Sequence, residues 1–83
     1  MAYYIYLIFS TNRTKNVSYV GYTNNIKNRL KLHNSSKGAK FTKGRKWKIM
    51  YYEKYKNKRK AMLREIYLKK NRKLRNQIKN KYR

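Results

Sequence analysis

Acidic residues are nearly absent from this sequence of 83 residues. Two glutamates, Glu53 and Glu65, stand against 25 lysines and arginines, and the formal net charge is +23. Charge of one sign at this density repels itself unless a polyanion offsets it. Nucleic acid is the polyanion that we expect, because lysine and arginine release condensed counterions from phosphates and gain affinity in doing so.

Cysteine is missing altogether, and histidine occurs once. These absences exclude a disulfide framework, a zinc site built on thiolates and a cysteine nucleophile. Long apolar runs are missing too. The longest, Ala2 to Phe9, is too short to span a bilayer and lacks the basic region and cleavage site of a signal peptide. We therefore expect a soluble, intracellular protein of the cytoplasm, nucleoid or nucleus.

The sequence does contain enough apolar material for one small core. Its hydrophobic fraction of 40% and aromatic fraction of 16% exceed those of a disordered basic tail. A chain of this length forms one domain and no more. We expect residues 1–83 to make up that single domain, with a basic, helical part from about residue 58 to residue 83.

Three segments have the pattern of β-strands. The apolar run Tyr3 to Phe9 predicts a central strand, and Val17 to Tyr22 predicts a second strand that pairs with it as a hairpin. The polar segment Ser10 to Asn16 is expected to be a longish connecting loop. Trp47 to Glu53 alternates between two sets of side chains, as a third strand does.

Three further segments are predicted to be helical. Thr23 and Asn24 are good N-caps for a helix that carries Ile26 and Leu30 one turn apart and ends near residue 33 or 34. Lys58 to Lys70 forms the second helix. A third carries one thin apolar stripe, made of Leu74, Ile78 and Tyr82. The order of elements gives an α+β domain with a small, three-stranded, mostly antiparallel sheet flanked by helices.

Two tyrosines and two residues of the first helix are candidates for chemistry. Tyr6 and Tyr19 lie on neighbouring strands of the hairpin, so both phenols can occupy one face of the sheet. Most tyrosines in such strands only pack. Arg29 and His33 are four residues apart and share one helix face, where an arginine can hold a phosphate and a histidine can orient or protonate its oxygen. The alternative is a solvated face with an incidental histidine.

Glu65 lies at the border of the apolar stripe of its helix, where a side chain can face a cleft. Its ordinary reading is an ion pair with Lys69, one turn later. Its functional reading is a ligand for Mg²⁺, an ion often held by one or two carboxylates, several waters and substrate phosphate. Glu53 has no comparable setting, and we expect it to be a surface residue at a strand end.

Residues 35–46 form a loop in which cations alternate with aromatic residues, as in a surface that tracks phosphates and stacks on a base. We expect nucleic acid to contact Lys37, Lys40, Phe41, Lys43, Arg45 and Lys46, with Trp47 beside them and Lys69 on the later helix. The last helix, also basic, is expected to clamp the backbone. The sequence contains no base-reading pattern and no sign of a preference for branched or nicked DNA.

Several motifs, in this order, resemble the GIY-YIG nuclease domain, above all its small single-domain members. They are the strands Tyr4-Ile5-Tyr6 and Tyr19-Val20-Gly21, the helix with Arg29 and His33, the segment HNSSKGAKFTKGR, and the late Glu65. The likeness covers nearly the whole chain. Three departures exist: Tyr4 replaces the first motif's glycine, Val20 replaces an isoleucine, and the asparagine that often follows the glutamate has three competing candidates, Asn71, Asn76 and Gln77.

The resemblance implies a metal-dependent nuclease that cuts a phosphodiester by in-line attack of water. One of the phenols of Tyr6 and Tyr19 would help to deprotonate the water while the other orients it or the phosphate. Arg29 would stabilise the transition state, His33 would assist, and Glu65 would hold Mg²⁺ or Mn²⁺. Gly21 would be the motif glycine, at which a side chain would crowd the site.

An ordinary tyrosine has a pKa of about 10 and is a poor base near neutrality. We expect the surrounding cations to lower that pKa. The activity expected is therefore that of a metal-dependent DNA endonuclease, of the kind that serves repair or recombination. The alternatives are a non-catalytic, basic nucleic-acid-binding module and an adaptor built on a decayed nuclease fold.

Overall fold

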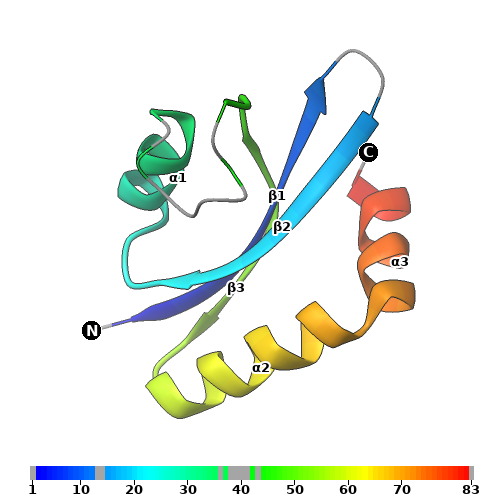
Figure 1. The fold of residues 1–83 in the computed structure, drawn as a ribbon. Helices are drawn as coiled ribbons and strands as arrows, with labels where there is room; N and C mark the ends of the chain where they lie inside the picture. The colour runs from blue at the N-terminus through cyan, green and yellow to red at the C-terminus, as the bar shows by residue number, and fades with distance from the viewer. Residues whose placement is uncertain (1, 13–14, 36, 38–41, 43, 83) are drawn as a thin grey trace.

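Strand β1 (Tyr3–Asn12) is the centre of a three-stranded antiparallel sheet, with β2 (Lys15–Thr23) on one side and β3 (Lys48–Tyr55) on the other (Figure 1). The structure is a computed structural model that describes residues 2–12, 15–35, 37, 42 and 44–82. Its register pairs Tyr6 with Gly21 on β2 and with Tyr52 on β3. The central strand and the class of the fold are as the sequence predicted.

The helices cover both faces of this sheet (Figure 1). Helix α1 (Ile26–Asn34) lies on one face, and α2 (Lys58–Lys70) and α3 (Arg72–Tyr82) lie on the other. Because side chains of a strand alternate between faces, β1 supplies both layers. Ile5 and Leu7 pack toward α2 and α3, whereas Tyr6 and Ile8 pack toward α1. The candidate tyrosine thus points into the smaller of the two cores.

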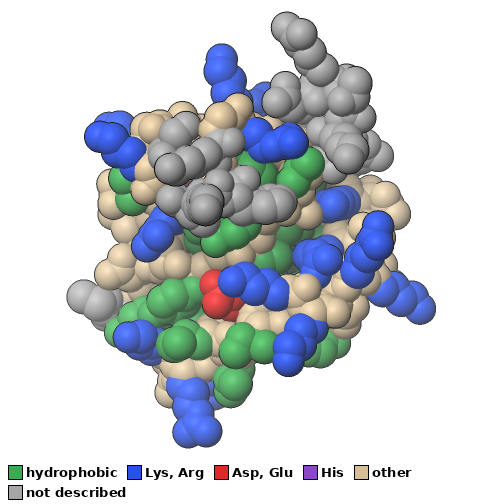
Figure 2. Space-filling model, in the orientation of Figure 1, with side chains coloured by type: hydrophobic (Ala, Val, Ile, Leu, Met, Phe, Trp, Pro, Cys, Tyr) green, Lys and Arg blue, Asp and Glu red, His purple; other side chains and the backbone are tan. Residues whose placement is uncertain are grey.

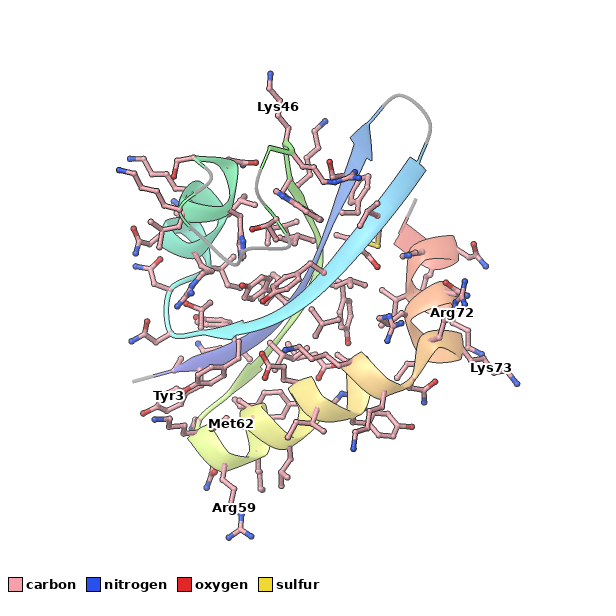
Figure 3. The ribbon with its side chains drawn as sticks, viewed as in Figure 1. Tyr3, Lys46, Arg59, Met62, Arg72 and Lys73 are labelled. Atoms are coloured by element: carbon pink, nitrogen blue, oxygen red, sulfur yellow. The ribbon has the colours of Figure 1, made fainter. Side chains whose placement is uncertain are left out.

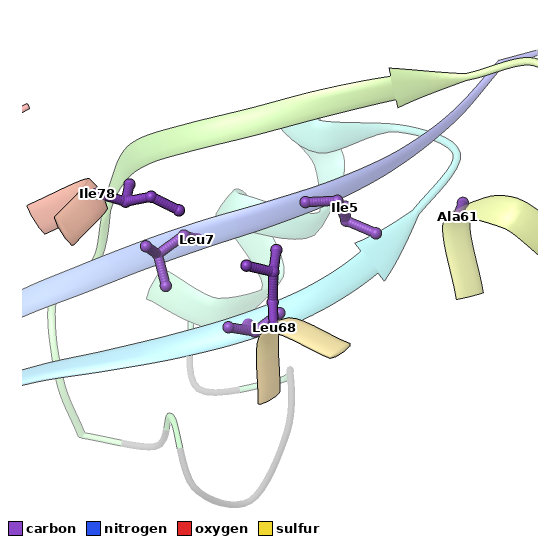
Figure 4. Packing of buried hydrophobic residues seen from close by; sticks show 6 residues of the cluster. Ile5, Leu7, Ala61, Leu68 and Ile78 are labelled. Atoms are coloured by element: carbon purple, nitrogen blue, oxygen red, sulfur yellow. The ribbon is translucent and has the colours of Figure 1, made fainter. Parts of the chain in front are cut away.

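The larger core holds β1 and β2 against α2 and α3. Its centre consists of Ile5, Leu7, Val20, Ala61, Leu68 and Ile78, all buried; Figure 4 shows the cluster from close by. Burying a side chain such as leucine or isoleucine stabilises the fold by about 1.5–3 kcal/mol. The two apolar positions predicted for α3 whose side chains are described, Leu74 and Ile78, both face this core. This packing fixes α2 across the sheet and so fixes the place of Glu65.

The hairpin of β1 and β2 is tighter than the sequence predicted. The strands run to Asn12 and from Lys15, which pair with each other, so residues 10–12 and 15–16 belong to the ladder. The prediction of a long polar loop from residue 10 to residue 16 was therefore wrong. Polar residues can extend a ladder whose pairing has already been set by the apolar part of the strands.

The N-cap of α1 is Asn25, which follows the two predicted caps, Thr23 and Asn24. Its side chain accepts a hydrogen bond from the Asn28 amide at 3.0 Å. Thr23 is buried at the end of β2, and its hydroxyl accepts from the Asn25 amide at 3.1 Å. Three neighbouring residues, at positions 23–25, have side chains that can cap a helix. Because Thr23 is buried at the end of β2, it is not the one that caps α1. The helix ends at Asn34, as predicted.

Helix α2 leaves several of its apolar side chains half exposed. Ala61 and Leu68 face the core, whereas Met62, Leu63, Ile66 and Tyr67 are each about half exposed. No helix in residues 2–12, 15–35, 37, 42 and 44–82 has the length and apolar character that crossing a membrane requires.

Candidate active site

Tyr6 and Gly21 form the floor of the candidate site. They face each other across β1 and β2, and the Tyr6 ring lies over the position where a Gly21 side chain would be. A Cβ atom at Gly21 would overlap the hydroxyl and the outer ring carbons of Tyr6. Tyr6 is 2% exposed. The absence of a side chain at Gly21 is therefore what allows the phenol to occupy this place.

His33 is joined to Tyr6 by a buried hydrogen bond. Its Nε2 lies 2.8 Å from the Tyr6 hydroxyl, and its Nδ1 lies 2.9 Å from the Thr42 hydroxyl. The ring of His33 is 1% exposed, on the side of α1 that faces the sheet. His33 therefore does not lie on a solvated face of the helix.

Tyr19 lies beside this pair on β2, the edge strand of the sheet. Its ring meets the His33 ring edge to face, with centroids 5.3 Å apart. Tyr6 and Tyr19 occupy the same face of the sheet, as the hairpin predicted. Tyr19 is half-buried and helps to line a pocket of about 300 Å³ with Ser18, Val20, Lys69 and Arg75. It is the phenol of the two that lies nearer to solvent.

Glu65 and Lys69 reach the same edge from α2. The Lys69 ammonium is 5.9 Å from the centre of the Tyr19 ring and 3.8 Å from the Glu65 carboxylate. After burial and the charge of Tyr19, the charge of Glu65 also raises the pKa of Tyr6, by a smaller amount. On the face drawn in Figure 2 the acidic atoms form one small patch beside Lys and Arg side chains.

The pKa of Tyr6 is shifted in the direction opposite to the one expected from the sequence. Burial raises the pKa of the Tyr6 hydroxyl far above its ordinary value, and the charges of Tyr19 and Glu65 add to this shift, while Arg29 opposes it. The protein's own cations therefore do not lower the pKa of Tyr6 as expected, because loss of water outweighs the one arginine. The lowering expected from a bound divalent cation stays a prediction. Burial, and then the charge of Arg29, lower the pKa of His33. Near neutrality the pair is a neutral phenol against a neutral imidazole.

Glu53 is not the surface residue that the sequence predicted. Arg64 holds it with two hydrogen bonds of 3.0 Å, and the hydroxyls of Tyr51 and Tyr55 donate to its two oxygens. Burial acts to raise the pKa of Glu53, but the hydrogen bonds from Arg64, Tyr51 and Tyr55 together bring it below its usual value. Glu53 thus links β3 to α2, and both of its oxygens are already engaged in hydrogen bonds.

The residues fit a divalent cation that takes one ligand from the protein and the others from water and substrate. No group of three or more histidine or acidic side chains converges anywhere in the described part of the chain. With Glu53 engaged, Glu65 is the carboxylate available at the site; its side chain is 20% exposed and forms an ion pair with Lys69. One hard oxygen ligand suits an ion whose other ligands are waters and substrate phosphate, as is common for Mg²⁺.

The predicted nucleic-acid contacts are only partly placed by the structure. Lys37 and Lys46 are exposed and Arg45 is half-buried, whereas Lys40, Phe41 and Lys43 lie outside the described residues. Trp47 is not a stacking platform: it is 2% exposed and its indole donates to the Thr42 carbonyl at 2.9 Å.

Two further residues have local roles that the sequence did not reveal. Arg75, expected to grip the backbone of nucleic acid, donates to the carbonyls of Leu68 and Lys69 at the end of α2. Asn71, one candidate for the late asparagine, accepts from the Leu74 amide at 3.0 Å. Its side chain therefore caps α3, and the structure gives no reason to add it to the site.

Thr42 is the site neighbour that sequence reasoning missed. It is fully buried and bonded to His33, nine residues earlier. No helix or strand periodicity links the two positions, since Thr42 lies outside α1 (Ile26–Asn34).

Known proteins resemble the chain over most of its length. The sequence pattern of the GIY-YIG catalytic domain matches residues 2–83. A UPF0213 protein of Clostridium perfringens is 51% identical over 53 residues, 63% of this chain and 57% of that protein.

Two other relatives show the same likeness. A UPF0213 protein of Bacillus licheniformis is 55% identical over 53 residues, which cover 63% of this chain and 55% of that protein. One of Oceanobacillus iheyensis is 38% identical over 68 residues, which cover 81% and 76%. The match thus spans little more than half the length of the Clostridium and Bacillus proteins. No solved structure matches the chain significantly.

Proposed function

Since the chain belongs to the GIY-YIG catalytic domain family, we propose that it is a divalent-metal-dependent endonuclease that hydrolyses phosphodiester bonds of DNA. The family implies nuclease-type activity and a nucleic-acid substrate. The metal, the choice of DNA and the roles of the residues are the parts that we propose.

One observation carries the proposal: residues from three other elements, α1, β2 and α2, act on the Tyr6 hydroxyl. His33 is hydrogen-bonded to it, and Tyr19, Arg29 and Glu65 all act on its ionisation. A core that served only stability would gain little from collecting two phenols, a guanidinium, an imidazole and a carboxylate at one edge of a sheet. Titratable groups with perturbed pKa values in one place are typical of functional sites.

In the proposed reaction, water attacks phosphorus opposite the leaving sugar oxygen. The new P–O bond forms as the bond to the leaving oxygen breaks, and the leaving oxygen keeps the electron pair. One of the phenols of Tyr6 and Tyr19 gives up its own proton to a neighbouring base and accepts the proton of the water, while the other orients the water or the phosphate. Arg29 stabilises the extra negative charge on the phosphoryl oxygens through its fork of donors.

Glu65 is the residue that would hold Mg²⁺ or Mn²⁺, together with the substrate phosphate. Such an ion, when bound, offsets the negative charge of the phosphoryl group. Lys69 contacts the same carboxylate at 3.8 Å, near the limit for an ion pair, and about half of the Lys69 side chain is exposed, so the pair is readily exchanged. Lys69 can therefore turn to a phosphate when substrate arrives.

The remaining cations support binding to the phosphate backbone without base reading. Lys46, Arg59, Arg72 and Lys73 project from the periphery of the molecule, away from the sheet (Figure 3). Cations that are free to rotate bring affinity through counterion release but no sequence code. We propose that DNA is gathered in this way and that the phenols and Glu65 act on whichever linkage reaches the β2 edge.

The test is incubation of supercoiled plasmid with the purified protein, with and without Mg²⁺ or Mn²⁺, beside the Glu65→Ala variant. We expect nicked or linear plasmid only with the wild type and metal, and DNA affinity within about twofold in the variant, because one carboxylate adds little to counterion release. Equal cleavage by the variant would remove the metal assignment. Tight binding without any cleavage would instead make the protein a non-catalytic binding module.

A further inference from the structure

Thr42 extends the Tyr6–His33 pair into a chain of three buried groups. Its hydroxyl lies 2.9 Å from His33 Nδ1, and Tyr6 lies 2.8 Å from Nε2 on the opposite side of the same ring. Thr42 is 0% exposed, and His33 is 1% exposed. Each ring nitrogen of the imidazole therefore meets a defined oxygen rather than water.

The position of Thr42 is held from two directions. The Trp47 indole donates to the Thr42 carbonyl at 2.9 Å. The Asn34 side chain then fixes Trp47, since it accepts from the Trp47 amide and donates to the Trp47 carbonyl. His33 and Asn34 are consecutive residues of α1, so the helix grips the returning segment at both Thr42 and Trp47.

The neutral imidazole has one donor nitrogen and one acceptor nitrogen, so its two hydrogen bonds are linked. A phenol is a much stronger acid than a neutral imidazole N–H, and an imidazole lone pair is a better acceptor than a phenol oxygen. The stable arrangement therefore has Tyr6 donating to Nε2. Nδ1 must then carry the proton and donate to the Thr42 hydroxyl oxygen.

We propose that Thr42 is a positioning residue for the nuclease reaction, holding His33 in the tautomer whose Nε2 lone pair faces the Tyr6 hydroxyl. The catalytic part of this inference rests on the proposed function. In this arrangement Tyr6 passes its proton to Nε2 as its oxygen takes the proton of the attacking water, so the phenol stays neutral and His33 becomes an imidazolium. His33 afterwards returns its proton to solvent. Thr42 accepts from Nδ1–H in both states, so it need not move.

The hydrogen-bond chain is tested by the ¹⁵N chemical shifts of the imidazole. The chain contains one histidine, so the ring signals belong to His33 without further assignment. We expect a protonated Nδ1 and an unprotonated Nε2 in the wild type and in Thr42→Ser, which keeps the hydroxyl. Thr42→Val keeps the shape but would leave a buried Nδ1–H without an acceptor, so we expect the proton to move to Nε2.

Cleavage by the same three proteins tests the catalytic meaning. We expect Thr42→Val to lower kcat by about a hundredfold, the lower range of what general acid–base catalysis contributes, with KM unchanged. Thr42→Ser should stay within about threefold of the wild type. Melting temperatures separate these effects from unfolding, and if Thr42→Val does not fold, the wild-type tautomer and Thr42→Ser still decide.

Three results would overturn the inference: a wild-type His33 protonated at Nε2, an unchanged kcat in Thr42→Val, or a loss in Thr42→Ser as large as that in Thr42→Val. Failure of the proposed function looks different. A wild-type protein with Nδ1 protonated that cleaves no DNA would keep the hydrogen-bond chain and refute the nuclease.

Discussion

Glu53 and Glu65 are the two carboxylates of the chain, and their surroundings differ in the donors that each meets. Glu53 accepts four hydrogen bonds, two from Arg64 and one each from Tyr51 and Tyr55. That number fills the lone-pair sites of a carboxylate. In the described part of the chain, Glu65 contacts one lysine at 3.8 Å.

The comparison shows that scarcity alone does not mark a functional residue. Both glutamates are rare anions in a chain of net charge +23, yet one is a structural tie between β3 and α2. The other forms an ion pair with Lys69, which in turn lies over the Tyr19 ring. The region around Glu53 should therefore govern stability, and the region around Glu65, Tyr6 and His33 should govern cleavage.

The largest expected difference between the two regions is the effect on the cleavage rate of removing one phenol hydroxyl in each. Tyr6→Phe should lower the rate of DNA cleavage by about a hundredfold or more, since it removes a group proposed to take part in proton transfer. Tyr51→Phe removes a hydroxyl that donates to Glu53 and should leave the rate within about twofold. Rates are compared at equal concentrations of folded protein. Equal rates for both variants would break the comparison.

Two glycine substitutions separate crowding of the site from backbone strain. Gly21→Ala places a methyl group against the Tyr6 ring and should cost about 1–3 kcal/mol of unfolding free energy, as overpacking does, together with most of the cleavage activity. Gly44→Ala meets no neighbour but has a φ of 76°, so it should cost about 1 kcal/mol through strain alone.

Urea unfolding and cleavage rates check this pair of variants. The rate of folded Gly44→Ala should equal that of the wild type. A fully active Gly21→Ala would mean that the position of Tyr6 over Gly21 does not matter for the reaction.

Because Glu53 has a structural role, its substitution should lower stability without changing cleavage, and the effect should be smaller than those above. Glu53→Gln keeps the size of the side chain but places an amide nitrogen against Arg64, so the free energy of unfolding should fall by about 1 kcal/mol. Cleavage by the folded protein should be unchanged. The matched Glu65→Gln variant should stay within about 0.5 kcal/mol of the wild type in stability. The reverse order of stabilities in urea unfolding would contradict the assignment of roles.

The weakest expected effect is a dependence of stability on pH. His33 has a folded pKa below its ordinary value of 6.5, because of burial and then Arg29. As the pH falls through about 6.5, the unfolded chain takes up this proton while the folded protein does not. Stability is therefore highest above 6.5 and declines until the folded pKa is reached. Glu53, whose pKa is lowered, loses its contribution only at lower pH.

Denaturant unfolding at several pH values checks this window. The chain has one histidine, so in His33→Gln the slope near pH 6.5 should vanish. A wild-type protein that gains stability on acidification through this range would contradict the burial of a neutral His33.

The sequence predicted the elements well where the pattern is local. The bounds of α2 and the central place of β1 follow from apolar periodicity. The choice of Asn25 as N-cap was missed because the buried hydroxyl of Thr23 is a tertiary feature. Trp47 was misread because an aromatic residue among lysines looks the same in a sequence whether it stacks on a base or packs in a core.

The candidate site was predictable only through its individual residues. Tyr6 and Tyr19 on one face follow from strand pairing, and Arg29 and His33 from helix geometry. The contacts that give them meaning join distant positions: Tyr6 and His33 are 27 residues apart, and Glu53 and Arg64 are 11 apart. Such pairs depend on how helices cross the sheet, which local patterns do not specify.

The most direct test of the account is the Mg²⁺ concentration that supports half-maximal DNA cleavage, measured for Glu65→Asp and Glu53→Asp beside the wild type. Each variant withdraws a carboxylate by one methylene and keeps its charge. We predict that Glu65→Asp raises this concentration about tenfold or more, in the range found for altered metal surroundings, and that Glu53→Asp leaves it unchanged. An unchanged Mg²⁺ requirement in folded Glu65→Asp would contradict the claim that this carboxylate holds the metal.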